Sequence, residues 1–123
     1  MSEPVALFPT GAPAAAGEGS APRRERVFFS RRELEQILQV YGRMVAAGHW
    51  RDYAMGDGAE SAVFAVFRRT AEFPIYRIEK RPALARRQGA WSVIAAGGRI
   101  VKRGGELEAV LRYFDRKLLK PVD

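Results

Sequence analysis

The sequence predicts an α+β fold: an antiparallel meander sheet of four to five strands, with an N-terminal and a C-terminal helix packed on one face. Three observations predict it. Apolar residues recur at helical spacing over residues 31–47, short strand-like segments separated by turn residues fill residues 50–103, and a second helical stripe begins at residue 107. Because strands joined by short turns tend to be neighbours in space, the strands are expected to pair in chain order.

The chain divides near residue 25. Residues 1–22 contain six alanines, three glycines and four prolines. A segment of this composition cannot bury enough apolar surface to offset the entropy lost on ordering. We therefore predict a disordered arm over residues 1–25 and a single α+β domain over residues 26–120.

The first helix is predicted over residues 31–47. Ser30 and Glu33 have the spacing of a capping box, in which the serine hydroxyl accepts from an early helical N–H and the glutamate accepts from the serine N–H. Gly48 supplies a left-handed residue at the C-terminal end. The buried stripe is expected to consist of Leu34, Ile37, Leu38, Tyr41, Met44 and Val45.

Segments with strand character follow the first helix. They cover residues 50–55, 61–67, 73–81, 91–96 and 99–103. The second of them is apolar at both even and odd positions, which is typical of a central strand covered on both faces or nearly so. Gly56-Asp57-Gly58 is a turn signal after the first segment, and Pro74 suits the start of a strand or a sheet edge.

Gly97-Gly98 predicts a hairpin with a two-residue loop, because both glycines tolerate a positive φ. The implied register is Ala96 opposite Arg99, Ala95 opposite Ile100, Ile94 opposite Val101, Val93 opposite Lys102 and Ser92 opposite Arg103. One face of this hairpin is then largely apolar. The other face carries Arg99 and Arg103.

A second amphipathic helix closes the domain. It follows Gly104-Gly105 and ends before Pro121. Its buried stripe is expected to consist of Leu107, Val110, Leu111, Phe114 and Leu118. The aromatic residues expected in the core are Phe64, Phe67, Trp91 and Phe114.

Positive charge is concentrated in one part of the chain. Residues 68–103 carry ten basic and two acidic side chains, a net charge of +8, whereas the whole chain has a net charge of +7. A surface of one sign attracts partners of the opposite sign, and a sequence pI of about 10.4 is typical of nucleic-acid-binding domains. The candidate binding residues are Arg77, Lys80, Arg81, Arg86, Arg87, Arg99, Lys102 and Arg103.

Three interpretations of this basic segment remain open. Its cations could contact phosphates, with Phe73, Tyr76 and Trp91 stacking on unpaired bases. They could instead contact an acidic protein surface, or they could simply be solvated. No RNP-type aromatic motif, GXXG loop or zinc-finger spacing is present to favour the first interpretation.

Within the third strand-like segment, Arg77, Glu79 and Arg81 share one face if the chain is extended. Glu79 could then be held between the two arginines. In that case Arg86 and Arg87, on the following loop, are the better candidates for contact with a partner, because loops on a rigid scaffold often carry function.

Two further features suggest chemistry but have simpler explanations. Gly104-Gly105, preceded by Lys102 and Arg103, could form an anion-binding nest at a helix N-terminus, but a tight turn that needs glycine is the simpler and favoured explanation of the pair. His49 near Asp52 could act as a general base, but no nucleophile completes a catalytic set. We therefore expect a protein that is not an enzyme.

Composition excludes several classes of protein. The chain has no cysteine and one histidine, so thiolate chemistry, disulfides and histidine-rich metal sites are excluded, and no cofactor is expected. No segment approaches the roughly 20 apolar residues of a membrane helix. No secretory signal is recognised either, so we expect a cytoplasmic protein without a membrane or metal partner.

Several motif strings resemble a known family of small bacterial proteins. They are residues 40–48 (VYGRMVAAG), 50–54 (WRDYA), 62–64 (AVF), 76–82 (YRIEKRP) and 84–89 (LARRQG). The family that they resemble is domain of unknown function 2794, and the similarity covers about residues 28–115. It implies a cytoplasmic bacterial protein and carries no activity, cofactor or site residue.

The leading hypothesis is a non-enzymatic binding protein whose basic strand-and-loop surface binds nucleic acid. The alternative is a protein-interaction module that binds an acidic protein partner. Both require the basic residues to gather on one surface once the chain folds.

Overall fold

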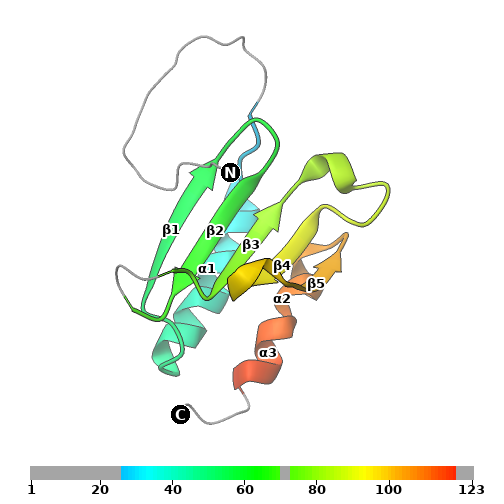
Figure 1. Cartoon of the computed structure of the whole chain (residues 1–123). Coiled ribbons are helices and arrows are strands. Elements are labelled where there is room, and N and C mark those ends of the chain that lie inside the picture. The colour runs from blue at the N-terminus through cyan, green and yellow to red at the C-terminus, as the bar shows by residue number, and fades with distance from the viewer. Residues whose placement is uncertain (1–25, 70–72, 119–123) are drawn as a thin grey trace.

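A computed structural model of the chain describes residues 26–69 and 73–118, so the predicted arm over residues 1–25 lies outside the described residues. Five strands form one antiparallel sheet in the order β1-β2-β3-β4-β5. Figure 1 shows the helices α1 and α2 behind this sheet, with α3 continuing from α2 beyond the lower edge of the strands. The predicted α+β class and the sheet of strands in chain order are therefore confirmed.

Helix α1 spans Arg31–Ala46 and begins with the predicted capping box. The N–H of Glu33 donates to Oγ of Ser30 over 3.1 Å, and the N–H of Ser30 donates to Oε1 of Glu33 over 2.8 Å. At the other end Gly48 has a φ of 86°, the left-handed conformation that glycine adopts without strain. The helix therefore starts and stops where local sequence chemistry predicts, to within one residue.

The strands are β1 (Asp52–Asp57), β2 (Ala62–Phe67), β3 (Tyr76–Lys80), β4 (Trp91–Ala95) and β5 (Ile100–Gly104). Two details of the first strand differ from the prediction. The strand runs through the predicted turn as far as Asp57, because Asp57 pairs with Ala62 and is held by Arg26. Trp50 lies before the strand begins. Its ring packs edge-on against the ring of Phe114, with the ring centroids 4.9 Å apart.

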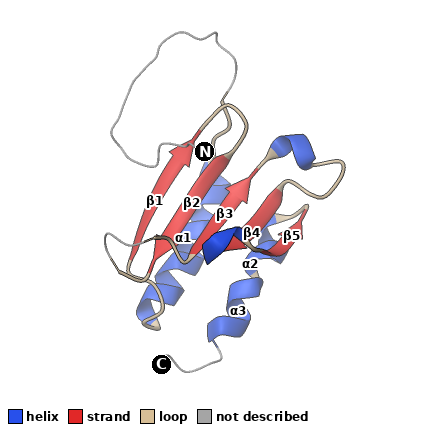
Figure 2. Ribbon diagram, viewed as in Figure 1, coloured by secondary structure: helices blue, strands red, loops and turns tan. Residues whose placement is uncertain are grey.

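The core lies between the helices and one face of the sheet (Figure 2). It takes alternate residues from the central strands, as the pleat requires. Its fully buried large side chains are Ile37, Met44, Phe64, Val66, Ile78, Val93, Val110 and Phe114. β2 is buried at its first five positions, in agreement with its uninterrupted apolar sequence.

The β4–β5 hairpin differs from the predicted two-residue loop. Its loop is the 3-10 turn Ala96–Gly98, closed by the N–H of Ala95 donating to the carbonyl of Arg99 over 2.7 Å. An irregularity in the β4–β5 register then places Ile94 opposite Ile100. Beyond it, the predicted pairs of Val93 with Lys102 and of Ser92 with Arg103 are confirmed.

The C-terminal helix is divided into α2 (Leu107–Leu111) and α3 (Tyr113–Leu118). A tight turn at Arg112 separates them, where the N–H of Asp115 donates to the carbonyl of Arg112 over 3.0 Å. The break leaves the apolar stripe intact. Its members are still buried or packed against the core: Leu107, Val110, Leu111, Phe114 and Leu118.

Candidate functional site

The strand register separates two faces of the sheet. Ile78 of β3 lies opposite Val93 of β4, and both belong to the core beneath the helices. The alternate residues of these strands therefore point to the other side, which we call the open face. Its members on β2 to β5 are Val63, Ala65, Phe67, Arg77, Glu79, Ser92, Ile94, Ile100 and Arg103.

One acidic residue of the open face partly neutralises the arginines around it. Nη2 of Arg81 donates to Oε2 of Glu79 over 3.1 Å, and Nη1 of Arg81 donates to Oε1 of Glu60 over 3.2 Å. The prediction that Glu79 pairs with arginines on its own face is thus correct for Arg81. Arg77 forms no ion pair with any described residue, so its charge remains available.

Arg103 is the most unusual side chain of the open face. Its neighbour on β4 is Ser92, which is 4% exposed. Nη1 of Arg103 is buried and has no hydrogen-bond partner among the described residues. A buried donor without an acceptor costs about 1–3 kcal/mol, more when it is charged. Arg103 also forms no ion pair with any described residue, so its charge is not neutralised within the described part of the chain.

The loop arginines, Arg86 and Arg87, lie next to this end of the sheet. They follow the 3-10 turn η2 (Pro82–Leu84), and both are exposed. The loop is anchored where Gly89, at a φ of 96°, lies against Gly104: a Cβ on Gly89 would come within 2.3 Å of the carbonyl carbon of Gly104. The contact requires glycine at position 89, whereas a Cβ on Gly105 would meet nothing within 4 Å and neither Gly104 nor Gly105 has a positive φ.

The remaining predicted site residues lie elsewhere. Lys80 is on the helix side of β3, where Nζ donates to Oε1 of Glu33 over 2.7 Å and to the carbonyl of Phe28 over 2.8 Å. Lys102 lies opposite Val93, which also places it away from the open face. Arg99 is in the turn before β5, at the opposite end of the strand from the loop arginines.

The contacts of Lys80 are structural and have a testable pH dependence. Burial opposes ionisation of Glu33, but the hydrogen bonds from Lys80 and Ser30 and the charge of Lys80 outweigh it and lower the pKa of Glu33. A lowered pKa in the folded state contributes stability above the unfolded value of about 4.3, and that stability is lost as the pH falls through the folded value.

We therefore expect the Glu33→Gln variant to be less stable than the wild type by about 1 kcal/mol at pH 7, with the difference shrinking between pH 5 and pH 3. Urea unfolding at several pH values measures it. The matched control is Glu35→Gln, which changes an exposed carboxylate on the same helix. A difference between the wild type and the Glu33→Gln variant that stays constant with pH would contradict the assignment.

Two of the three aromatic residues expected to stack on bases are in the core. Trp91 is 6% exposed and stacks on Phe29, with ring centroids 6.1 Å apart. Tyr76 packs against Tyr113 and Phe114, and burial together with the Tyr113 hydroxyl raises the pKa of Tyr76 to about 12. The prediction that these two rings stack on bases is therefore wrong, because the pleat directs both side chains towards the helices.

Two other aromatic residues are more accessible to a partner. Phe73 is 89% exposed in the connection before β3. Phe67, which sequence reasoning assigned to the core, is only half-buried and takes the open-face position at the end of β2. Counting alternate residues from Phe64 along the strand would have placed Phe67 on the side opposite the core.

The catalytic and metal-binding alternatives gain no support from the described residues. Neither ring nitrogen of His49 forms a hydrogen bond within residues 26–69 and 73–118, and Nε2 is buried there. Oδ1 of Asp52 instead accepts from the N–H of Tyr53 over 2.8 Å. In this part of the chain no three histidine, cysteine or carboxylate side chains could hold a metal ion, and no helix could span a membrane.

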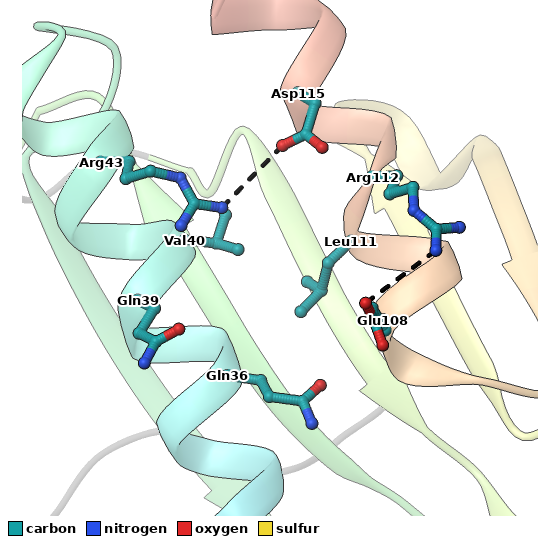
Figure 3. A pocket seen from close by; sticks show the side chains of 8 residues that line it. All are labelled: Gln36, Gln39, Val40, Arg43, Glu108, Leu111, Arg112 and Asp115. Atoms are coloured by element: carbon teal, nitrogen blue, oxygen red, sulfur yellow. Dashed lines mark ion pairs between the residues drawn. The ribbon is translucent and has the colours of Figure 1, made fainter.

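A groove of about 400 Å³ lies between α1 and the α2–α3 pair, away from the open face (Figure 3). Arg43 lies 3.9 Å from Asp115 across it, and Arg112 lies 4.0 Å from Glu108 on one wall. Because both cations already have carboxylate partners, the groove offers no excess charge to a ligand. Its lining is Gln36, Gln39, Val40, Arg43, Glu108, Leu111, Arg112 and Asp115.

Comparison with known proteins supports a family and nothing more specific. No curated protein and no solved structure matches the chain. Residues 27–111, which include all five strands and the first two helices, match the model of a family described as "Protein of unknown function (DUF2794)". The resemblance drawn from the sequence motifs is thereby confirmed, and the chain belongs to this family.

Proposed function

We propose that this protein is a non-enzymatic binding protein that holds single-stranded nucleic acid on the open face. The observation that carries the proposal is that Arg77 and Arg103, on one face of the sheet, form no ion pair with any described residue. Phosphate oxygens would pair with these guanidinium groups and neutralise their charge.

The surrounding charges favour a polyanion over a single anion. Arg77 lies on the same face as Arg103, and Arg86 and Arg87 extend the cationic surface along the loop. Several cations along one line can contact successive phosphates, and each contact releases counterions. We call Arg77, Arg86, Arg87 and Arg103 the basic surface.

Exposed apolar side chains on and beside the open face favour a single strand over a duplex. Unpaired bases can stack on such side chains, whereas the paired bases of a duplex cannot. Ile100 is 47% exposed on this face, and Phe73, which is 89% exposed, offers a ring near the half-buried Phe67 at the end of β2. Base stacking on such rings contributes about 1–3 kcal/mol per base and tolerates any sequence.

The test is fluorescence anisotropy with mixed-sequence single-stranded RNA and DNA oligonucleotides over a range of salt concentrations. We expect the logarithm of the affinity to fall linearly with the logarithm of salt, with a slope of about −0.7 for each phosphate neutralised. An affinity that does not change with salt would contradict phosphate binding. A pull-down that recovers one acidic protein after nuclease treatment would favour the protein-partner alternative.

Replacement of Glu79 provides a test in which nucleic-acid affinity should rise. Glu79 is the acidic residue among the open-face positions of β3 to β5, and its removal should raise nucleic-acid affinity about two- to fivefold, since it lowers local repulsion of phosphates. The matched control is Glu60→Gln, because Glu60 is the other partner of Arg81 but is 79% exposed and lies outside β3 to β5. Equal gains for Glu79→Gln and Glu60→Gln would mean that the open face is not where the phosphates bind.

A further inference from the structure

A second surface of the molecule lies at the opposite edge of the sheet from β5. Of the large apolar side chains that are exposed in the described residues, four lie on α1 and the edge strand β1. Tyr53 and Met55 of β1 are 40% and 41% exposed, and Leu38 and Val45 of α1 are 36% and 39% exposed.

A contact between Tyr41 and Tyr53 joins the exposed side chains of α1 to those of β1. Tyr41 lies between Leu38 and Val45 on the same stripe of α1, and its ring contacts that of Tyr53 at a centroid distance of 4.9 Å. A contiguous apolar patch of this kind on a small domain marks an interaction site more often than scattered apolar residues do.

The backbone of β1 is available beside this patch. The N–H of Tyr53 donates to Oδ1 of its neighbour Asp52, and the carbonyl of Asp57 accepts from Nη2 of Arg26 over 3.0 Å. Both groups therefore point away from β2, and the alternation of an antiparallel ladder places the N–H and carbonyl of Met55 on that outer side as well. The outer edge of β1 can thus accept another strand around Tyr53 and Met55. Just beyond the strand, the N–H of Val27 already donates to the carbonyl of Gly58 over 2.8 Å.

We propose that two copies of the chain pair antiparallel through the outer edges of β1, with the two-fold axis at Ala54. In this register Tyr53 lies opposite Met55 of the second copy, and Met55 lies opposite Tyr53. Both residues direct their N–H and carbonyl groups outward, so the two pairs are hydrogen-bonded, and an aromatic ring meets a thioether in each.

Charge complementarity supports a second copy as the occupant. The same register brings Arg51, which directly precedes β1, near Asp57 of the second copy, twice by symmetry. The N–H of Arg51 donates to the carbonyl of Phe67 over 2.8 Å, so only the side chain of Arg51 is available to the second copy. Arg51 is exposed and forms no ion pair within the described part of the chain. Asp57 receives both of its side-chain hydrogen bonds from Arg26 at Oδ1, so Oδ2 remains for the second cation.

Neighbouring registers are less favourable. A shift by one position would bring side chains of the open face opposite those of the helix side, which a continuous sheet does not allow. An axis at Met55 would place Tyr53 opposite Asp57, and an axis at Tyr53 would place Met55 opposite Arg51. Neither choice brings Arg51 next to Asp57.

The proposed pairing must displace the Asp52 carboxylate from the N–H of Tyr53. That hydrogen bond, like the one from Arg26, protects the edge of a free monomer. The cost is one local hydrogen bond on each copy. The gain is the two hydrogen-bonded pairs, burial of the apolar patch on both copies, and a continuous sheet whose two open faces lie on the same side.

Sedimentation equilibrium of the full chain tests the pairing. We expect a dimer whose dissociation constant rises at least tenfold in the Met55→Glu variant, because the carboxylate would be buried against Tyr53 of the second copy. The matched control is Ile100→Glu, which changes a 47% exposed apolar side chain on the other edge strand. A wild-type protein that remains monomeric up to about 100 µM would overturn the proposal.

Disulfide crosslinking tests the register. The chain contains no cysteine, so a single Ala54→Cys substitution can form a disulfide only with a second copy. At the two-fold axis the residues form a non-hydrogen-bonded pair with Cα atoms about 4.5 Å apart, within disulfide range. We expect crosslinking in a glutathione buffer at least tenfold faster than for Gln39→Cys, an exposed α1 position facing the groove. Equal rates for the two variants would overturn the pairing at Ala54.

Discussion

Replacement of Gly89 with alanine is expected to lower the free energy of unfolding by about 3–5 kcal/mol, with a fall in Tm of at least 10 °C. The new Cβ would lie 2.3 Å from the carbonyl carbon and 2.4 Å from the oxygen of Gly104. Both atoms are backbone atoms at the end of β5 and cannot move aside like a flexible side chain. The φ of 96° adds strain for any residue with a Cβ.

Variants of two other glycines distinguish the steric clash from the backbone strain in the loss of stability. Gly97 has a φ of 85° but nothing within 4 Å of an added Cβ, so Gly97→Ala should show the backbone strain alone, about 1–2 kcal/mol. Gly42 lies inside α1 with nothing within 4 Å, so Gly42→Ala should stabilise the protein by about 0.5–1 kcal/mol.

Thermal and urea unfolding of these three variants checks the ranking. A Gly89→Ala variant no less stable than Gly97→Ala would show that the loop does not pack on Gly104. The result also bears on function, because the approach of Gly89 to Gly104 positions the loop that carries Arg86 and Arg87. A folded variant with a displaced loop should bind nucleic acid more weakly than its stability alone would indicate.

The parts of the fold that the sequence predicted are those determined by local chemistry. Ser30 and Glu33 start α1 and Gly48 ends it, since capping depends on residues within one or two helical turns. The uninterrupted apolar sequence of β2 likewise identified a central strand. Both features are properties of short segments and need no knowledge of the tertiary structure.

The parts that the sequence did not predict depend on register and on distant contacts. The β4–β5 loop holds three residues instead of two, and the register irregularity at Ile94 follows from pairing that no dipeptide signal specifies. Trp50 lies outside β1, and its ring packs against Phe114 of the C-terminal helix α3. Such packing can be identified only once the helices are placed against the sheet.

In the candidate site, too, some features follow from the local sequence and others from distant contacts. The concentration of cations was visible in the composition, and alternation along the predicted strands already placed Arg77, Glu79 and Arg81 on one face. What the sequence did not show is which face of the sheet lies beneath the helices. Lys80 and Arg81 are adjacent in sequence, yet Lys80 binds Glu33 on the helix side and Arg81 binds Glu79 on the open face. Alternation along β3 accounts for this difference. The partner of Lys80 on α1, Glu33, could be identified only from the tertiary structure.

Charge reversal on the open face is expected to cause a large loss of nucleic-acid affinity. The double variant Arg77→Glu/Arg103→Glu should bind single-stranded RNA or DNA about 100-fold more weakly than the wild type at low salt, since each reversal removes a cation that binds phosphate and adds a repulsive charge. Its salt dependence should also be shallower, by about 0.7 in slope for each phosphate that is no longer neutralised. Anisotropy titrations at several salt concentrations measure both quantities.

The matched control for this pair is Arg31→Glu/Arg32→Glu, which changes the net charge by the same amount at two exposed positions of α1. It should weaken binding only a few-fold, through the general attraction of a basic protein for a polyanion. Arg103→Gln is a milder substitution for the case in which a buried glutamate prevents folding, and it should still cost about tenfold. Equal reductions in affinity for the two double variants would mean that binding follows net charge alone, and Arg77 and Arg103 would then have no specific part in it.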